Sequence, residues 1–159
     1  MKRWALIFLL LAAAACGMRS HSDIPALRAG KDVCSHCGMI ISDERLASGY
    51  VDDEGQNILF DDLGELFSAL SGLTAKVQEK AYVHDAVGGA WIKAQSAYYL
   101  RLPGLPTPMG SGIIAFKDSR AAADFARRSG FPGAAASDFK TVLASFSNPK
   151  EPAATSVGR

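Results

Sequence analysis

The chain has 159 residues, which is room for one modest core built as two small similar halves. Its 17 basic and 16 acidic residues nearly cancel, and this balance excludes the basic stripe of a nucleic-acid-binding protein. Apolar residues make up 48% of the chain, an ordinary share for a globular protein. The function must therefore be sought in motifs.

The first residues have the order of an export signal. Met1-Lys2-Arg3 is positively charged, residues 4–11 are apolar, and small residues then lead to Cys16. The apolar run is too short to span a bilayer, so we interpret residues 1–15 as a signal peptide.

The Ala-Ala-Ala-Cys sequence that ends this leader is similar to a bacterial lipoprotein processing site, although Ala13 stands where such sites usually carry Leu. Cleavage there predicts lipid on Cys16, a tether over residues 16–31, and an anchored, periplasm-facing protein, with the outer membrane favoured. An ordinary signal peptide that happens to end at a Cys is the alternative.

With Cys16 assigned to lipid, Cys34 and Cys37 are the only thiols left for the folded domain. An exported pair can form a disulfide, but a bridge at this spacing closes a tiny loop and constrains the unfolded chain little. Metal binding or redox chemistry therefore explains the pair better.

The predicted domain covers residues 32–146, and its first half, about 32–75, has a β-β-α pattern. Its expected elements are strands at 40–41, 47–51 and 56–60, a hairpin turn at 52–55, and a helix that Asp61-Asp62 caps and Gly72 ends. Apolar residues fall on one face of this helix, at Leu63, Leu66, Phe67 and Leu70.

The second half, about residues 80–131, repeats the order of strands followed by a helix. Its expected elements are strands at 81–85, 90–92, 96–102 and 113–116, a Pro-rich loop at 103–108, and a helix from Asp118-Ser119 to Gly130. A last short helix is expected at 137–146, followed by a frayed tail at 147–159. Separate blocks of strands and helices predict an α+β fold.

Soft donors are concentrated between Cys34 and Met39, and soft donors select Cu(I). We predict Cys37 as the first ligand and Met39 as the second, because both side chains would share a face of an extended segment. Met39 as core packing is the alternative. Cys34 is a less certain ligand that could instead be a redox partner or a bystander, and His84 is either a hydrogen-bonded structural residue or a group near the metal.

Two other classes remain open for the cysteine pair. A periplasmic thiol-disulfide oxidoreductase would use Cys34 and Cys37, but in thioredoxin-like proteins such a pair opens a helix, whereas a strand is expected after Cys37. A structural zinc site wants four ligands, and His36 and His84 would have to complete it.

Four motifs, in order, resemble the NosL family of exported copper-binding lipoproteins. They are Cys34–Asp43, Tyr82–Asp85, Trp91 with Ala94–Tyr99, and Pro108–Phe116. Two departures from the family pattern are a short connection between Trp91 and Ala94 and the absence of a Cys near Asp61-Asp62.

The resemblance implies paired α+β halves and one bound Cu(I), with Met109 as a third ligand contributed by the second half. It also implies a metallochaperone and not an enzyme. Such a protein would deliver copper for the copper-sulfide centre of nitrous oxide reductase, through periplasmic NosD of the NosDFY transporter complex.

Overall fold

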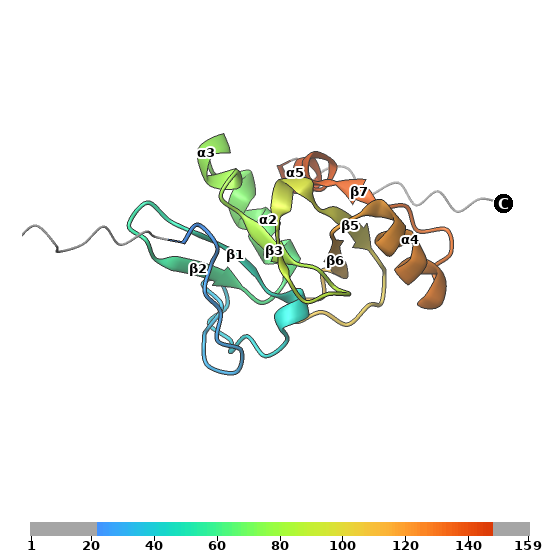
Figure 1. Ribbon diagram of the computed structural model, residues 1–159, viewed down its shortest axis with the longest axis horizontal. Coiled ribbons are helices and arrows are strands. Elements are labelled where there is room, and N and C mark those ends of the chain that lie inside the picture. The colour runs from blue at the N-terminus through green and yellow to red at the C-terminus, as the bar shows by residue number, and fades with distance from the viewer. Residues whose placement is uncertain (1–21, 148–159) are drawn as a thin grey trace, which may run out of the picture.

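The computed structural model of this chain describes residues 22–147. Its helices and strands form two antiparallel sheets with helices packed around them (Figure 1), which confirms the α+β class. In chain order they are η2 (Glu44–Leu46), β1 (Ser48–Val51), β2 (Asn57–Phe60), α2 (Leu63–Ser71), α3 (Ala75–Gln78), β3 (Tyr82–His84), β4 (Trp91–Lys93), η3 (Ala94–Ser96), β5 (Tyr98–Arg101), β6 (Ile113–Phe116), α4 (Ser119–Arg128), β7 (Ser137–Asp138) and α5 (Phe139–Ser147). The expected signal peptide, the lipid site at Cys16 and the tail lie outside the described residues.

The first sheet has the strand order β2-β1-β3-β4, with every neighbouring pair antiparallel. The predicted hairpin joins β1 to β2, and Gly55 supplies a φ of 80° in its turn. β3 pairs with the other edge of β1, so this sheet contains strands from both ranges, 32–75 and 80–131. The chain passes from the first sheet to the second at η3, between β4 and β5.

The second sheet has the order β6-β5-β7, and its two faces pack against different cores. Tyr99 and Ala115 face the larger core, whereas Leu100 and Phe116 face α4. This alternation follows from the two-residue period of a strand. A sheet covered on both faces needs apolar side chains on both, which explains the uninterrupted apolar run of β6.

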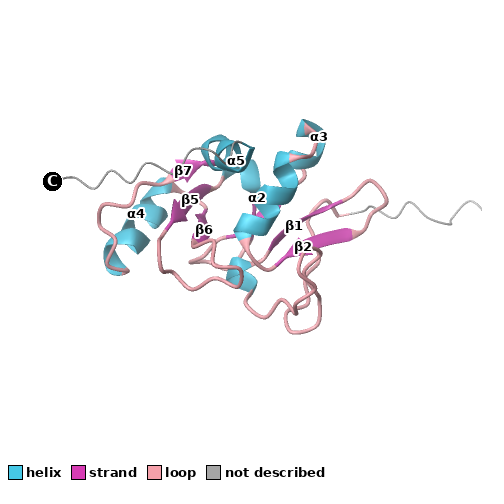
Figure 2. Ribbon diagram, turned by 180° about the vertical axis from the view of Figure 1, so that it is seen from behind, coloured by secondary structure: helices cyan, strands magenta, loops and turns pink. Residues whose placement is uncertain are grey.

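The last helix of the described chain returns to the first sheet's helix. Figure 2 shows α5 beside α2, and their contact is built around Phe67, whose ring lies 5.5 Å from that of Phe139 and 5.8 Å from that of Phe146. Tyr99 of β5 meets the same ring edge-on at 5.1 Å. The predicted final helix is thus confirmed, and the short β7 before it is an element that the sequence did not reveal.

The segment that follows β3 is bonded to β6 of the other sheet. The Ala86 amide donates to the Ala115 carbonyl at 2.9 Å, beside a parallel bridge between Asp85 and Ala115. The Asp85 carboxylate accepts from the Gly88 and Lys117 amides. The two sheets are therefore parts of one packed unit.

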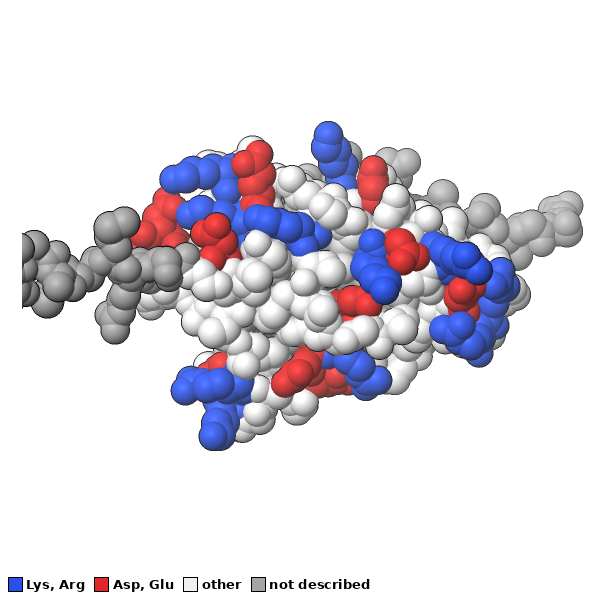
Figure 3. Space-filling model, viewed as in Figure 1, with Lys and Arg blue, Asp and Glu red and all other residues white. Residues whose placement is uncertain are grey.

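Charged side chains of both signs are interspersed on the face of the molecule shown in Figure 3. Five ion pairs lie within residues 22–147, and two of them join Asp53 to Lys76 and Lys80. This visible face has no large area in which all charged side chains share one sign. Within the same residues, no helix has both the length and the apolar character needed to cross a membrane.

Candidate metal site

The cysteine pair lies in a tight loop that reverses the chain. Val33 forms an antiparallel bridge with Ile40, and the Cys34 amide donates to the Met39 carbonyl at 2.8 Å. Gly38 has a φ of 73°, so the segment is not extended there, and the short strand expected at residues 40–41 is reduced to this single bridge. Cys37 and Met39 therefore do not share one face of an extended segment, contrary to the prediction from sequence.

Ser35 attaches this loop to β2. Its amide donates to the Leu59 carbonyl at 2.7 Å, and its hydroxyl accepts from the Leu59 amide at 3.2 Å. These bonds place the loop next to the segment in which β2 ends and α2 begins. Two carboxylates, Asp61 and Glu65, come from that segment.

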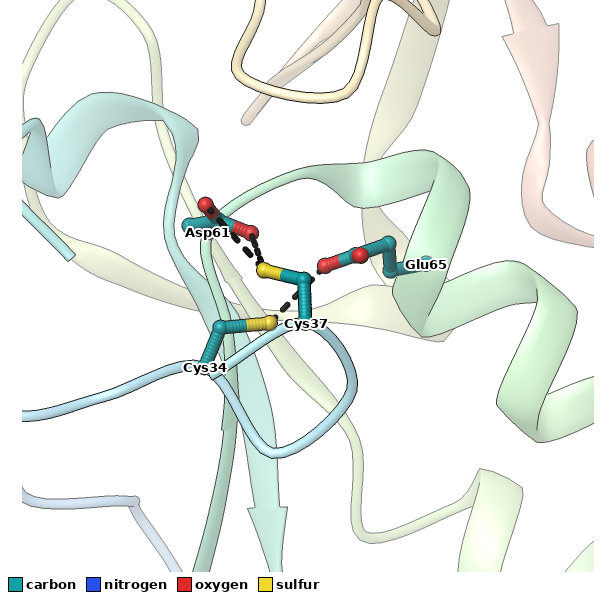
Figure 4. Close-up of side chains that lie close together, drawn as sticks. All are labelled: Cys34, Cys37, Asp61 and Glu65. Atoms are coloured by element: carbon teal, nitrogen blue, oxygen red, sulfur yellow. Dashed lines mark hydrogen bonds between the residues drawn. The ribbon is translucent and has the colours of Figure 1, made fainter. Parts of the chain in front are cut away.

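Cys34, Cys37, Asp61 and Glu65 converge at this junction (Figure 4), and one donor atom from each lies within 4.8 Å of all the others. Cys34 Sγ donates to Glu65 Oε2 at 2.8 Å, while Cys37 Sγ lies 3.7 and 3.8 Å from the two carboxylate oxygens of Asp61. Cys34, Asp61 and Glu65 are each more than nine-tenths buried, and Cys37 is partly exposed.

Burial sets the electrostatics of this cluster. It raises the pKa of the Cys34 thiol to about 12, against the lowering effect of nearby backbone amides. Burial also raises the pKa of Glu65, with the neighbouring Asp61 carboxylate adding to the effect and the bond from Cys34 opposing it. No Lys or Arg within residues 22–147 forms an ion pair with Asp61 or Glu65. A bound cation would therefore supply positive charge that no ion pair within these residues supplies to the two carboxylates.

Asp62, the next residue along, connects the second half of the molecule to this junction. Its Oδ1 accepts from the Gly64 amide at 2.6 Å and caps α2. Its Oδ2 accepts from the Thr107 hydroxyl at 2.7 Å, the Met109 amide at 3.0 Å and the Ser111 amide at 3.4 Å. Burial acts to raise the pKa of Asp62, but these bonds outweigh it and hold the pKa below the ordinary value.

The loop that carries Met109 is thereby attached one residue away from Asp61, which faces Cys37. Met109 is 49% exposed and Met39 is 43% exposed. Both residues thus lie at the surface, which argues against core packing as the role of Met39.

His84 lies apart from the four-residue cluster. It is buried, its Nδ1 lies 3.2 Å from the Ala47 carbonyl, and its ring centroid is 3.8 Å from that of Trp91. Burial lowers its pKa, so a neutral ring is favoured. These contacts fit the structural alternative for His84, while His36 is exposed on the cysteine loop.

Asp61 and Glu65 are not predicted as members of the site from the sequence, where Asp61-Asp62 has the pattern of a helix cap. A signal was available in α2, where Glu65 interrupts the stripe that runs from Leu63 to Leu70. A carboxylate in an otherwise apolar first turn marks either a partner or a site.

The fold and the site together define a small α+β protein with a largely buried cluster of thiols and carboxylates that is suited to a metal ion. A family model named NosL matches residues 26–144, and the chain belongs to the NosL family. The fold is similar to that of the copper chaperone NosL from Shewanella denitrificans, with a TM-score of 0.59 and 19% sequence identity over 75% of this chain and 95% of that one. No curated protein matches the sequence.

Proposed function

We propose that this protein is a Cu(I) carrier that binds one ion through Cys37, Met39 and Met109 and releases it by ligand exchange. Membership of the NosL family and a fold shared with a copper chaperone support a carrier over an enzyme. Thiolate and thioether sulfurs are soft donors, and they favour Cu(I) over harder ions.

One observation supports this proposal most directly, namely the adjacency of Asp61 and Asp62. Asp61 faces the Cys37 sulfur, and Asp62 accepts a hydrogen bond from the Met109 amide at 3.0 Å. The segments that carry Cys37 and Met109, which are distant in the chain, are therefore attached to neighbouring residues. Since both methionines are exposed, a partner can approach the ion and replace its ligands one at a time.

Cys34 is less suited to this surface site than Cys37 is. It is buried and bonded to Glu65, and its pKa of about 12 means that its proton is harder to remove. His84 is engaged with Ala47 and Trp91. We therefore assign the Cu(I) ligand set to Cys37 and the two methionines.

The same geometry disfavours a thiol-disulfide oxidoreductase. A reactive Cys-x-x-Cys pair usually has a thiol whose pKa is lowered at a helix N-terminus. Here Gly38 follows in a left-handed conformation, no helix begins at the pair, and the pKa of Cys34 is raised.

The cellular role that we propose is delivery of copper for the copper-sulfide centre of nitrous oxide reductase, through periplasmic NosD of the NosDFY complex. The family resemblance supports this destination. The leader sequence supports a lipid anchor at Cys16 and a periplasm-facing position, with the outer membrane favoured. In cells producing Cys37→Ser, purified reductase should then lack the copper of that centre, and full copper loading would contradict the role.

Competition against a chromophoric Cu(I) chelator under anaerobic conditions tests the ligand set. We expect one Cu(I) per chain and at least about tenfold weaker binding in Cys37→Ser, Met39→Leu and Met109→Leu, since loss of a ligand costs no less than loss of its support. Met18→Leu is the matched control and should bind as the parent does. Unchanged affinity in both Cys37→Ser and Met39→Leu would refute the assignment.

A further inference from the structure

The cysteine loop brings its two thiols within reach of each other. In an extended strand, residues three apart lie about 10 Å from one another, which is too far for a disulfide. Here the Gly38 amide donates to the Cys34 carbonyl at 2.9 Å and closes a turn, and the Cys34 and Cys37 sulfurs lie within 4.8 Å of each other (Figure 4). A gap of this size is comparable to the displacement of a sulfur atom when its side chain changes rotamer.

We infer that Cys34 and Cys37 form a reversible disulfide that prevents Cu(I) binding at Cys37, and that reduction of this disulfide restores binding. The inference rests on the proposed function, because it concerns access to the proposed Cu(I) ligand set. Oxidation would remove the only thiolate of that set and leave the two thioethers of Met39 and Met109. The cysteine pair would then act as a redox switch for copper binding.

The two thiols differ in exposure, and this difference assigns them different roles. Cys37 is partly exposed and can meet an incoming disulfide, whereas Cys34 is 2% exposed. No other cysteine lies within residues 22–147, so each thiol has one possible partner in this part of the chain. An accessible thiol beside a second, resolving thiol is the arrangement in which a mixed disulfide is converted to an internal one.

Glu65 is placed to take the proton of the buried thiol. The thiolate, and not the thiol, is the nucleophile in disulfide exchange, so burial without a proton acceptor would leave Cys34 inert. Cys34 Sγ donates to Glu65 Oε2 at 2.8 Å, and Glu65 Oε1 is buried without a hydrogen-bond partner. The carboxylate therefore already holds the proton that must be removed, and no protein group engages its second oxygen.

The exchange balances with a low-molecular-weight or protein disulfide as the oxidant. Cys37 loses its proton to solvent and attacks one sulfur of this disulfide, a mixed disulfide forms, and the first thiolate of the oxidant leaves. Cys34 then gives its proton to Glu65, its sulfur attacks the Cys37 sulfur, and the second thiolate leaves. The protein loses two electrons and two protons, and the oxidant gains both and becomes two thiols.

The surroundings of the pair favour the disulfide over ionised thiols. Glu65 and Asp61 lie beside the two sulfurs, and no Lys or Arg within residues 22–147 forms an ion pair with either carboxylate. A strongly oxidising Cys-x-x-Cys protein is easily reduced because its reduced form is stabilised. That stabilisation is missing here, so we expect the disulfide to persist in an oxidising compartment until a reducing dithiol reaches it.

Thiol counting in glutathione redox buffers tests the disulfide. The Cys16→Ser protein is used, so that Cys34 and Cys37 are its only thiols, and free thiols are counted by alkylation and intact mass. We expect two free thiols in excess reduced glutathione and none in excess glutathione disulfide, with no bound glutathione. Cys34→Ser is the matched control and should retain a glutathione adduct on Cys37. Two persistent free thiols, or glutathione on both cysteines, would overturn the inference.

Glu65→Gln tests the route of the proton. The carboxamide can accept a hydrogen bond but cannot take the proton, so closure of the disulfide should slow by at least about tenfold and a glutathione adduct should accumulate. Asp53→Asn is the control, because Asp53 is exposed and pairs with lysines. Circular dichroism confirms that both variants are folded. Closure at the same rate in both variants would overturn the assignment of Glu65 as the proton acceptor.

Copper binding separates the switch from the carrier. Anaerobic competition with a chelator in thiol-free buffer should show Cu(I) binding at least about tenfold weaker in the oxidised protein than in the reduced one. Thiols are counted again after each titration. Equal affinity of the two forms, with the disulfide intact, would overturn the switch. If Cys37→Ser weakens Cu(I) binding while the parent pair does not close, the carrier stands and the switch fails. If the pair closes while Cys37→Ser binds Cu(I) normally, the disulfide stands and the Cu(I) ligand set fails.

Discussion

The substitution Asp62→Asn tests the link between the Met109 loop and α2. Asp62 Oδ2 accepts two hydrogen bonds of 3.0 Å or less, from the Thr107 hydroxyl and the Met109 amide. The Asn side chain keeps one oxygen, which can still accept from the Gly64 amide and cap the helix. Its NH₂ group, which is itself a donor, then faces the two donors and cannot accept their hydrogen bonds. Hydrogen bonds to a charged group contribute about 1.5–3 kcal/mol each, and part of this is recovered by water, so we expect a loss of about 2–4 kcal/mol in the free energy of unfolding.

Asp118→Asn is the matched control, because Asp118 caps α4 through the Ala121 amide and holds no loop. Asn and Asp are nearly equivalent caps, so this change should cost less than about 0.5 kcal/mol. Urea unfolding at neutral pH, followed by far-ultraviolet circular dichroism, measures both variants. A difference between them below about 0.5 kcal/mol would refute the role of Asp62 as the link between the halves.

The pH dependence of the same variant gives a second check. The pKa of Asp62 is lowered in the folded protein, so its contribution is fully present above the unfolded pKa of about 3.9 and is lost as the pH falls through the folded pKa. The stability difference between parent and Asp62→Asn should therefore persist at neutral pH and shrink in strong acid. A difference that does not change with acidification would mean that the charge of Asp62 is not what holds the loop.

Three further changes have definite expected outcomes. Phe67→Ala should lower the free energy of unfolding by about 3–5 kcal/mol, because the ring is fully buried. Urea titration measures this loss. A loss below about 1 kcal/mol would show that the core collapses around the cavity. Gly112→Ala should lower the free energy of unfolding by about 2 kcal/mol or more, since φ is 64° and the new Cβ would lie 2.5 Å from the Leu102 carbonyl oxygen. Gly133→Ala is the control, because its new Cβ would meet nothing within 4 Å, and it should be nearly neutral in the same urea titration. Equal effects of the two substitutions would contradict this explanation. Burial raises the pKa of Glu65, so the metal-free parent protein should lose stability as the pH rises from about 4.3, the unfolded pKa, through the folded pKa. In Glu65→Gln, the free energy of unfolding should depend less on pH over this range. Parallel pH dependence in the two proteins would contradict this expectation.

The local elements were predictable because their signals are local. The turn at residues 52–55, the Asp62 cap with its apolar stripe, and the Asp118 cap each depend on residues adjacent in sequence. The pairing of β3 with β1 was not predictable in this way. A strand pattern indicates that a segment is a strand, but it does not indicate which edge of which other strand this segment will pair with.

The site likewise has one part that was predictable from local sequence and another that was not. The Cys34–Met39 segment indicated soft-metal chemistry from its composition alone. The contribution of Asp61 and Glu65 depends on where Ser35 attaches the cysteine loop, through a pair of hydrogen bonds to Leu59 that no sequence pattern encodes. Gly38 likewise permits either an extended or a left-handed backbone, and the structure uses the second.

The return of α5 to α2 has a consequence for how the chain reaches this state. A ribosome makes the N-terminal part first, so Phe67 emerges long before Phe139 and Phe146, which cover it. Until that last helix is complete, the growing polypeptide has an open apolar face and no finished interior. We therefore expect the larger core to be completed only after α5 has been synthesised.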